Sequence, residues 1–487
     1  MNLKGIFKLS CLLFFCFIIL QSCKSQNNKT NPDQNNSIDK SVLSVPDEKI
    51  TENDLKNYQN KLNALLDTHL LKSNFNGAIL IAKGGHILVE KYIGYKDVQH
   101  KKDSIDANTA FHLASTSKPF TGMATLLLVQ EGKLALTDSI QKFFPNFPYK
   151  NITIRELLSH RSGLPSYLNF MEDATKWPKG QMMSNQDVLN FMIQHQPAIY
   201  AMPDKRFHYN NSNFVLLALI IEKVSGQSYP QFIKQHIFDK ISMKHSFVYD
   251  PKDTNQHPIM SYQANGAVWI NDMFDNTYGD KNIYSTPRDM MLWDRALYSD
   301  NFIRKSLLDS AYTPQSHEKP SIHNYGLGWR LLNFKNGKNV VYHFGRWHGF
   351  TPAFGRLLDE QVSVIILGNR FNSNIYRIAK ELYKVFGDYA DGSDSTNVSD
   401  DESSNEIKTV TPPVIIQKKE SKPSKNIQLK KTEPKQLKVK VKENKKTAKS
   451  ITKKQDSKKA NKKVTSKKTP SNTTSKAATK VAEKKKK

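Results

Sequence analysis

The strongest constraint on the fold is a set of strand-like apolar segments at both ends of one long region. Near its start, Gly77–Lys83 (GAILIAK) and His86–Ile93 (HILVEKYI) flank two glycines, a pattern typical of a tight hairpin turn. Three further strand-like segments lie near its end: Val340–Phe344, Thr351–Leu358 and Val362–Leu367. Because mainly helical patterns separate these two groups, we expect both ends to join in one mostly antiparallel sheet, in an α+β fold.

Helical patterns supply the layers that would cover this sheet. The first is amphipathic, with apolar residues at helical spacing: Leu55, Tyr58, Leu62, Leu65 and Leu66. Asn213–Val224 is nearly all apolar and is followed by Gly226, which indicates a buried helix with a glycine cap. Asn374–Phe386 is predicted to be the closing helix. We therefore expect one large domain at residues 51–390, consisting of the sheet, flanking helices and a helical subdomain.

The first residues have the pattern of an export signal. Lys4 and Lys8 precede an apolar stretch, Leu12–Leu20, which is too short to span a bilayer. It ends in LQSC, which resembles a bacterial lipobox with Cys23 as the lipidated residue. We expect a signal peptide at 1–22, a flexible tether at 23–50, and a lipid-anchored protein of the cell envelope that faces the periplasm, with the outer membrane favoured. The alternatives are an ordinary secretory signal or a short membrane anchor.

The positive charge of the chain is concentrated at its C-terminal end. The whole chain has a formal net charge of +27, and residues 401–487 hold 28 lysines and 8 acidic residues, a charge of +20. This segment has no Phe, Tyr or Trp, so we expect residues 391–487 to be disordered. Anionic envelope polymers or lipids are the expected partners, rather than specific nucleic acid, because an exported chain meets little of it. A solvated spacer without a partner is the alternative.

Ser115 and Lys118 form the pair of residues on which catalysis would depend. Three positions apart, they share one face of a helix and lie close enough to hydrogen-bond. Pro119 fits the first turn of that helix, so Ser115 is placed at its N-terminus. A serine hydroxyl becomes nucleophilic when a base takes its proton, and a desolvated lysine can be that base. Alone, this spacing is a weak signal because it often occurs by chance.

Further motifs occur in the order found in one known family. Phe75–Gly94 resembles the opening hairpin of the serine β-lactamase-related family, which includes class C β-lactamases, DD-carboxypeptidases and family VIII-type esterases. Five more segments resemble its later motifs: Leu157–Pro165 (LLSHRSGLP), Phe207–Asn211 (FHYNN), Gly279–Asp289 (GDKNIYSTPRD), Tyr325–Trp329 (YGLGW) and His343–Gly345 (HFG). The resemblance covers roughly residues 75–385 and implies a β-lactamase/transpeptidase-like fold.

The resemblance also implies a role for each residue of the catalytic group. Ser115 is expected to attack an acyl carbonyl, with Lys118 as its base. Tyr209 would share that duty or relay the proton to the leaving group. Asn211, which carries both a donor and an acceptor, would orient the substrate ester or amide. His160 is placed outside this group, as a residue that holds a loop by hydrogen bonding.

The strand after the third motif is expected to contact the substrate. Gly345 would allow close approach of the backbone, and the backbone N–H groups of Ser115 and Arg346 would form the oxyanion hole. His343 replaces the lysine of the Lys-Thr-Gly motif, which many β-lactamases use to bind a carboxylate. With an ordinary pKa of about 6.5, a histidine is mostly neutral at pH 7. Arg346 or Arg330 is the candidate for the missing charge.

The predicted function is hydrolysis of an ester or amide through an acyl-enzyme, by an esterase or a DD-carboxypeptidase-like enzyme. The substrate would be a small acyl compound or a peptidoglycan stem peptide. The alternative is a non-catalytic binding or sensor lipoprotein that keeps the fold. No cofactor or metal is expected, since His343 and His348 lie five positions apart with no third ligand placed by spacing.

Overall fold

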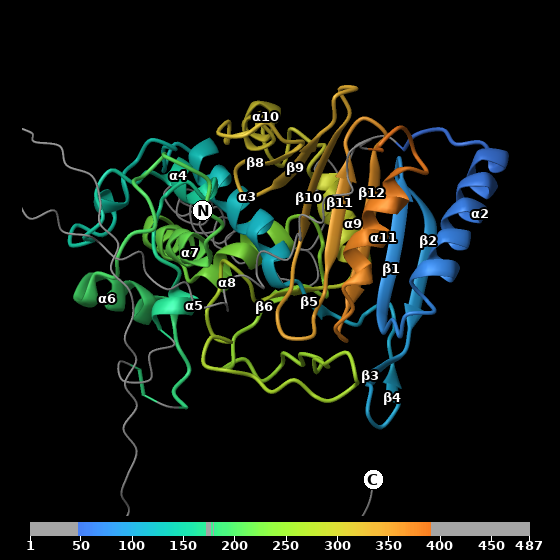
Figure 1. The fold of residues 1–487 in the computed structure, drawn as a ribbon, viewed down its shortest axis with the longest axis horizontal. Helices are drawn as coiled ribbons and strands as arrows, with labels where there is room; N and C mark the ends of the chain where they lie inside the picture. Colours follow the sequence, from blue (N-terminus) through green and yellow to red (C-terminus); the bar gives the residue numbers. More distant parts are fainter. Residues whose placement is uncertain (1–46, 172–176, 179, 391–487) are drawn as a thin grey trace, which may run out of the picture. The chain divides into compact units, whose positions relative to one another are not determined.

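A seven-stranded antiparallel sheet organises the computed structural model, which describes residues 47–171, 177–178 and 180–390 (Figure 1). The strand order is β2 (His86–Ile93), β1 (Gly77–Lys83), β12 (Val362–Gly368), β11 (Ala353–Leu357), β10 (Asn339–Phe344), β9 (Arg330–Asn333) and β8 (His323–Tyr325). The pairing of β1 with β12 joins the two ends of the domain, as predicted. The signal peptide, Cys23, most of the tether and the Lys-rich tail lie outside the described residues.

Both faces of the sheet centre are covered, which explains why every residue of β1 and β12 is buried. On one face, α2 (Glu52–His69) and α11 (Asn374–Tyr383) contact each other and the sheet. Their core includes Ile79 and Val364. On the other face, α9 (Pro287–Ala296) contacts β1 and β12. The core on that face includes the residues of β1 and β12 that lie next to Ile79 and Val364 in the two strands. The alternation of strand side chains thus separates two hydrophobic cores.

The helical subdomain is built around α7 (Asn211–Ser225), whose residues from Asn211 to Ile221 are all buried. Gly226 ends it in the left-handed conformation (φ 71°), as the sequence predicted. The helices that contact it are α3 (Lys118–Gln130), α4 (Ile154–Leu158), α5 (Tyr167–Phe170), α6 (Asn185–His195) and α8 (Tyr229–Ile233), and α10 (Lys305–Ala311) follows α9 along the chain. Among the described residues, no helix is both long enough and apolar enough to cross a membrane.

Two smaller sheets complete the fold. One is a short hairpin of β3 (Tyr95–Asp97) and β4 (Lys102–Ser104). The other has three strands in the order β5 (Phe111–His112), β7 (Ile283–Ser285) and β6 (Phe247–Val248). Strand β5 of this second sheet ends three residues before Ser115, so the sheet is joined directly to the segment that leads into α3.

Candidate active site

Ser115 lies on a tight turn that the small three-stranded sheet holds in place. It belongs to a 3₁₀ segment, Ala114–Ser117, which continues directly into α3, rather than to α3 itself. Ala114 has a φ of +46°, in the left-handed region that residues with a side chain rarely adopt. His112 Nδ1 accepts a hydrogen bond from the Ala114 N–H at 2.9 Å. The Leu113 N–H also donates to Ile283 O of β7, at 2.7 Å. Both bonds stabilise the turn that carries Ser115.

Lys118 is fully buried, and its ammonium group is bound from three separate segments. Its Nζ donates to Ser115 Oγ at 3.0 Å, to Asn211 Oδ1 at 2.6 Å and to the Asp280 carbonyl oxygen at 3.1 Å. Within the Ala114–Ser117 segment, Ser115 is partly exposed and the other three residues are buried. Its side chain is therefore accessible to a substrate while its hydroxyl bonds to Lys118. The predicted pair is therefore within hydrogen-bond distance, the contact through which a neutral Lys118 amine would take the serine proton.

The ring of Tyr209 is close to two cationic side chains. The Nζ of Lys118 is 4.8 Å from the centre of its ring, and the guanidinium carbon of Arg330 is 4.9 Å from it. Negative charge that develops on the phenol oxygen during proton transfer would be attracted by both cations. The structure thus brings Ser115, Lys118, Tyr209 and Asn211 together, as the sequence predicted.

His160 joins the loop after α4 to the start of α7. Its Nδ1 accepts hydrogen bonds from the Asn210 backbone N–H and the Asn213 side chain, both at 3.1 Å. Its ring also packs against that of Tyr209, with 4.4 Å between the centres. Burial, followed by the charge of Lys118, holds the pKa of His160 well below its ordinary value. The residue is a neutral structural partner of Tyr209, which agrees with its place outside the predicted catalytic group.

Gly345 allows strand β10 to meet the backbone of Ser115. A side-chain carbon added at this glycine would lie 2.8 Å from the Ser115 backbone nitrogen, so any other residue would push the two segments apart. Tyr376 of α11 donates from its hydroxyl to the Gly345 carbonyl at 2.6 Å. That carbonyl and the Arg346 N–H belong to one planar peptide group and point in opposite directions. Tyr376, which the sequence analysis missed, therefore sets the direction of the predicted oxyanion-hole donor.

His343 is fully buried, and both of its ring nitrogens bond within the protein. Nδ1 lies 2.8 Å from the Phe344 carbonyl oxygen and Nε2 lies 3.1 Å from the Tyr325 hydroxyl. Burial, and then the charge of Arg330, lowers its pKa well below the ordinary value, so the ring is neutral. Of the two arginines named as sources of charge, Arg330 is beside Tyr209, whereas the guanidinium of Arg346 lies over the Phe371 ring.

Asp272, Asp275 and His348 are a group of possible metal ligands that sequence spacing did not reveal. Their ligand atoms all lie within 4.8 Å of one another, and His348 Nε2 is 2.9 Å from Asp275 Oδ1. The two carboxylates precede the histidine by more than 70 positions, so only the fold brings them together.

Comparison with known proteins agrees with this geometry. The family model described as "Beta-lactamase" matches residues 63–385. The chain belongs to this family. A penicillin-binding protein of Bacillus subtilis is 33% identical over 343 residues, which cover 66% of this chain and 74% of that protein. The enzyme is therefore a serine hydrolase related to the β-lactamases and penicillin-binding proteins.

Solved structures show the same fold at lower identity. A penicillin-binding protein from Bacillus halodurans has a TM-score of 0.57 and 24% identity, over 67% of this chain and 99% of that one. The D-amino acid amidase of Ochrobactrum anthropi, in complex with L-phenylalanine amide, has a TM-score of 0.56 and 22% identity, over 68% and 98%. These likenesses establish the β-lactamase/transpeptidase-like fold expected from the sequence.

The buried histidines of this β-lactamase-family domain predict loss of stability in acid. Burial lowers the pKa of His112 to about 4 from an ordinary value of 6.5. Between these values the unfolded chain binds a proton that the folded one does not. His112 alone should therefore reduce the free energy of unfolding by about 3 kcal/mol as the pH falls through this window, with no further loss below it.

Thermal unfolding across this pH range would measure the effect. His112→Gln should flatten the dependence of Tm on pH, whatever it does to Tm at neutral pH. His317→Gln is the matched control, because His317 is exposed and should leave the slope unchanged. Equal slopes for the wild type and His112→Gln would contradict the prediction.

Proposed function

We propose that this enzyme hydrolyses an ester or amide through an acyl-enzyme on Ser115. The observation that carries the proposal is the 3.0 Å contact between Ser115 Oγ and a fully buried Lys118 Nζ. A lysine held in such a site can act as a base in its neutral form, because burial disfavours the charged form. Asn211, whose Oδ1 bonds the same Nζ, keeps the amine directed at the serine.

The reaction follows from the positions of these groups. Ser115 Oγ attacks the carbonyl carbon while its proton passes to the Lys118 amine, and the negative oxygen is held by the N–H groups of Ser115 and Arg346. The proton then reaches the leaving alcohol or amine through Tyr209, and the acyl-enzyme remains. Water then attacks the carbonyl carbon of this ester while its proton passes to the Lys118 amine. The bond between that carbon and Ser115 Oγ breaks, Lys118 returns the proton to Ser115 Oγ, and the acid is released.

Covalent labelling tests the nucleophile. A fluorophosphonate probe should label the wild-type chain and fail to label Ser115→Ala, while Lys118→Ala should slow labelling by at least about 100-fold because the serine loses its base. Ser104→Ala, at an exposed position in β4, is the control and should label normally. Undiminished labelling of Ser115→Ala would refute the assignment. A wild type that does not react would favour the alternative, a binding or sensor protein.

We further propose that the substrate carries a carboxylate near the scissile bond, which Arg330 binds. His343 is neutral and buried, whereas Arg330 places a guanidinium beside Tyr209. Arginine binds carboxylates in a planar, two-bond geometry. The names of the similar proteins, a penicillin-binding protein and a D-amino acid amidase, support a peptide or amino acid derivative over a simple ester.

Substrate preference tests the role of Arg330. Arg330→Gln should lower kcat/KM for a peptide ending in D-Ala-D-Ala by about 10-fold or more relative to its effect on a neutral p-nitrophenyl ester. Arg346→Gln is the control, since the Arg346 guanidinium lies over the Phe371 ring. Its ratio of kcat/KM for the peptide to kcat/KM for the ester should stay near that of the wild type. An equal loss on both substrates would assign Arg330 to Tyr209 instead of to the substrate.

We also propose that the enzyme is a lipid-anchored protein of the cell envelope. The LQSC sequence ending at Cys23 and the charge of +20 in residues 401–487 support this placement, the tail being suited to anionic lipids or polymers. Cys23→Ser should move the protein from the membrane fraction to the soluble fraction and abolish palmitate incorporation. The control is Cys16→Ser, which lies within the predicted signal peptide and should leave both unchanged. Labelling that persists in Cys23→Ser would exclude the anchor.

A further inference from the structure

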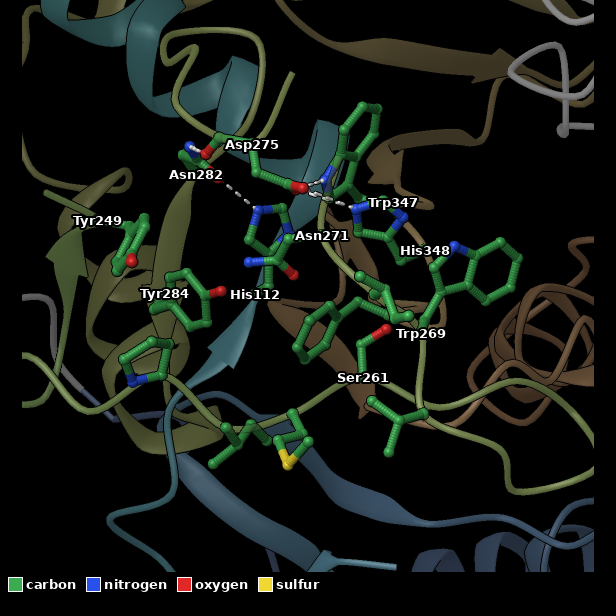
Figure 2. Close-up of a pocket in the computed structure, with 16 residues that line it drawn as sticks. His112, Tyr249, Ser261, Trp269, Asn271, Asp275, Asn282, Tyr284, Trp347 and His348 are labelled. Atoms are coloured by element: carbon green, nitrogen blue, oxygen red, sulfur yellow. Dashed lines mark hydrogen bonds and ion pairs between the residues drawn. The ribbon is translucent and has the colours of Figure 1, made fainter. Parts of the chain in front are cut away.

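The buried carboxylate of Asp275 is bonded by the two residues that directly follow Arg346 in the chain. It accepts hydrogen bonds from Trp347 Nε1 at 2.5 Å and from His348 Nε2 at 2.9 Å (Figure 2). The backbone N–H of Asp272 donates to its other oxygen, also at 2.5 Å. Both oxygens are therefore used, and the carboxylate joins the loop before β7 to the turn that follows β10.

These contacts keep Asp275 in its charged form. Burial alone would raise its pKa, but the interaction with His348 and the hydrogen bond from Trp347 outweigh burial, so the pKa lies below its ordinary value. An ionised carboxylate only accepts hydrogen bonds, so the ring N–H groups of the two neighbours are the donors. Bonds to a charged acceptor are stronger than those between neutral groups, so an amide in this place would hold the turn less firmly.

The turn that Asp275 holds has a backbone conformation that needs such support. His348 has a φ of +52°, in the left-handed region that residues with a side chain rarely adopt. On either side of it, the backbones of Trp347 and Phe350 exchange two hydrogen bonds, of 3.2 and 2.9 Å. The position of the chain directly after Arg346 is thus fixed by a tight turn and by the carboxylate that its side chains reach.

A second arm of hydrogen bonds runs from the backbone of Asp275 to the turn that carries Ser115 (Figure 2). Asn282 Nδ2 donates to the Asp275 carbonyl at 2.5 Å, and Asn282 Oδ1 lies 2.8 Å from His112 Nε2. His112 Nδ1 in turn accepts from the Ala114 N–H. Because burial lowers the pKa of His112 to about 4, its ring is neutral, and with Nδ1 as an acceptor its one proton is on Nε2. Each bond of this arm therefore has one donor and one acceptor.

The two arms also pack against each other. The ring of Phe350, at the end of the turn after β10, stacks on the ring of His112 with 5.3 Å between their centres. Tyr284 of β7 contacts the same histidine edge-on, at 4.9 Å. Because such packed rings leave little free space, a shift of one arm would disturb the other.

Both arms end next to a donor of the proposed oxyanion hole. One ends at Ala114, whose neighbour Ser115 supplies the first N–H, and the other ends at Trp347, whose neighbour Arg346 supplies the second. We propose that Asp275 is a positioning residue that sets the distance between these two donors. The inference rests on the proposed function, because it requires that these N–H groups bind the oxyanion of that reaction. A misplacement of about 1 Å can cost about 100-fold in rate.

A pair of esters tests the proposal, because the oxyanion hole acts on the carbonyl oxygen alone. The probes are p-nitrophenyl acetate and the matching thionoester, in which sulfur replaces that oxygen. Sulfur is larger and accepts hydrogen bonds weakly, so two well-placed donors favour the oxygen ester. Asp275→Asn should lower kcat/KM about 10- to 100-fold for the oxygen ester, mainly through kcat, and less than about 3-fold for the thionoester. A residue that only stabilises the fold would lower both equally.

Matched substitutions are the controls. Asp272→Asn makes the same change three positions earlier, at an exposed side chain, and keeps the backbone N–H that bonds Asp275. Its ratio of kcat/KM for the oxygen ester to kcat/KM for the thionoester should stay within about 2-fold of the wild type. Trp347→Phe removes the Nε1 donor and should lower this ratio about 3- to 10-fold. Trp269→Phe changes a ring that packs 5.8 Å from that of His348, and it should keep the ratio.

Each outcome decides the proposal. An unchanged ratio in Asp275→Asn would overturn it, and so would a ratio that falls as far in Asp272→Asn, since the effect would then belong to the two charges together. If Asp275→Asn does not fold, as judged by thermal unfolding, Trp347→Phe decides on its own. A wild type that hydrolyses the esters and is labelled at Ser115, with ratios unchanged in the variants, would refute this inference alone. A wild type that neither turns over nor labels would refute the proposed function as well.

Discussion

The site depends on the burial of one amine. Lys118 is fully removed from solvent, and an ammonium group in such a place is strongly unfavourable unless polar groups replace its water shell. The replacements come from Ser115, Asn211 and Asp280, which belong to three segments spread over 166 positions. The start of α3, the start of α7 and the loop before β7 must therefore meet at this nitrogen. The same requirement places the Ser115 hydroxyl beside the Lys118 amine.

The sheet provides the other side of the site, and the closing helix determines its detail. Gly345 brings the end of β10 against the Ser115 backbone, and Tyr376 of α11 holds the Gly345 carbonyl. Because β1 and β12 pair, α11 packs beside α2 over one face of the sheet, where Tyr376 can reach β10 (Figure 1). The pairing of the domain's two ends thus contributes to the position of the peptide group that is proposed to form the oxyanion hole.

Local sequence patterns account for the helices and strands. Contacts between residues far apart in the sequence account for the side chains that surround the candidate active site. The hairpin around Gly84 and the helix ended by Gly226 follow from neighbouring residues alone. The hairpin strands have the predicted limits, and the helix begins two residues earlier and ends one residue later than predicted. The order of motifs also led to Ser115 and Lys118. Tyr376 and the group of Asp272, Asp275 and His348 carry no such pattern, because their partners lie roughly 30 to 75 positions away.

The sequence by itself determined the class of the fold, the family resemblance and the pair formed by Ser115 and Lys118, since each depends on spacing within one segment. Only the tertiary structure decided how the neighbouring polar groups are used. His343 occupies the position of a substrate-binding lysine in sequence, yet its nitrogens bond to Phe344 and Tyr325 and its ring is neutral. Arg330 supplies the charge beside Tyr209 instead. Protonation and contact depend on burial and on neighbours across the sheet, which a linear pattern does not encode.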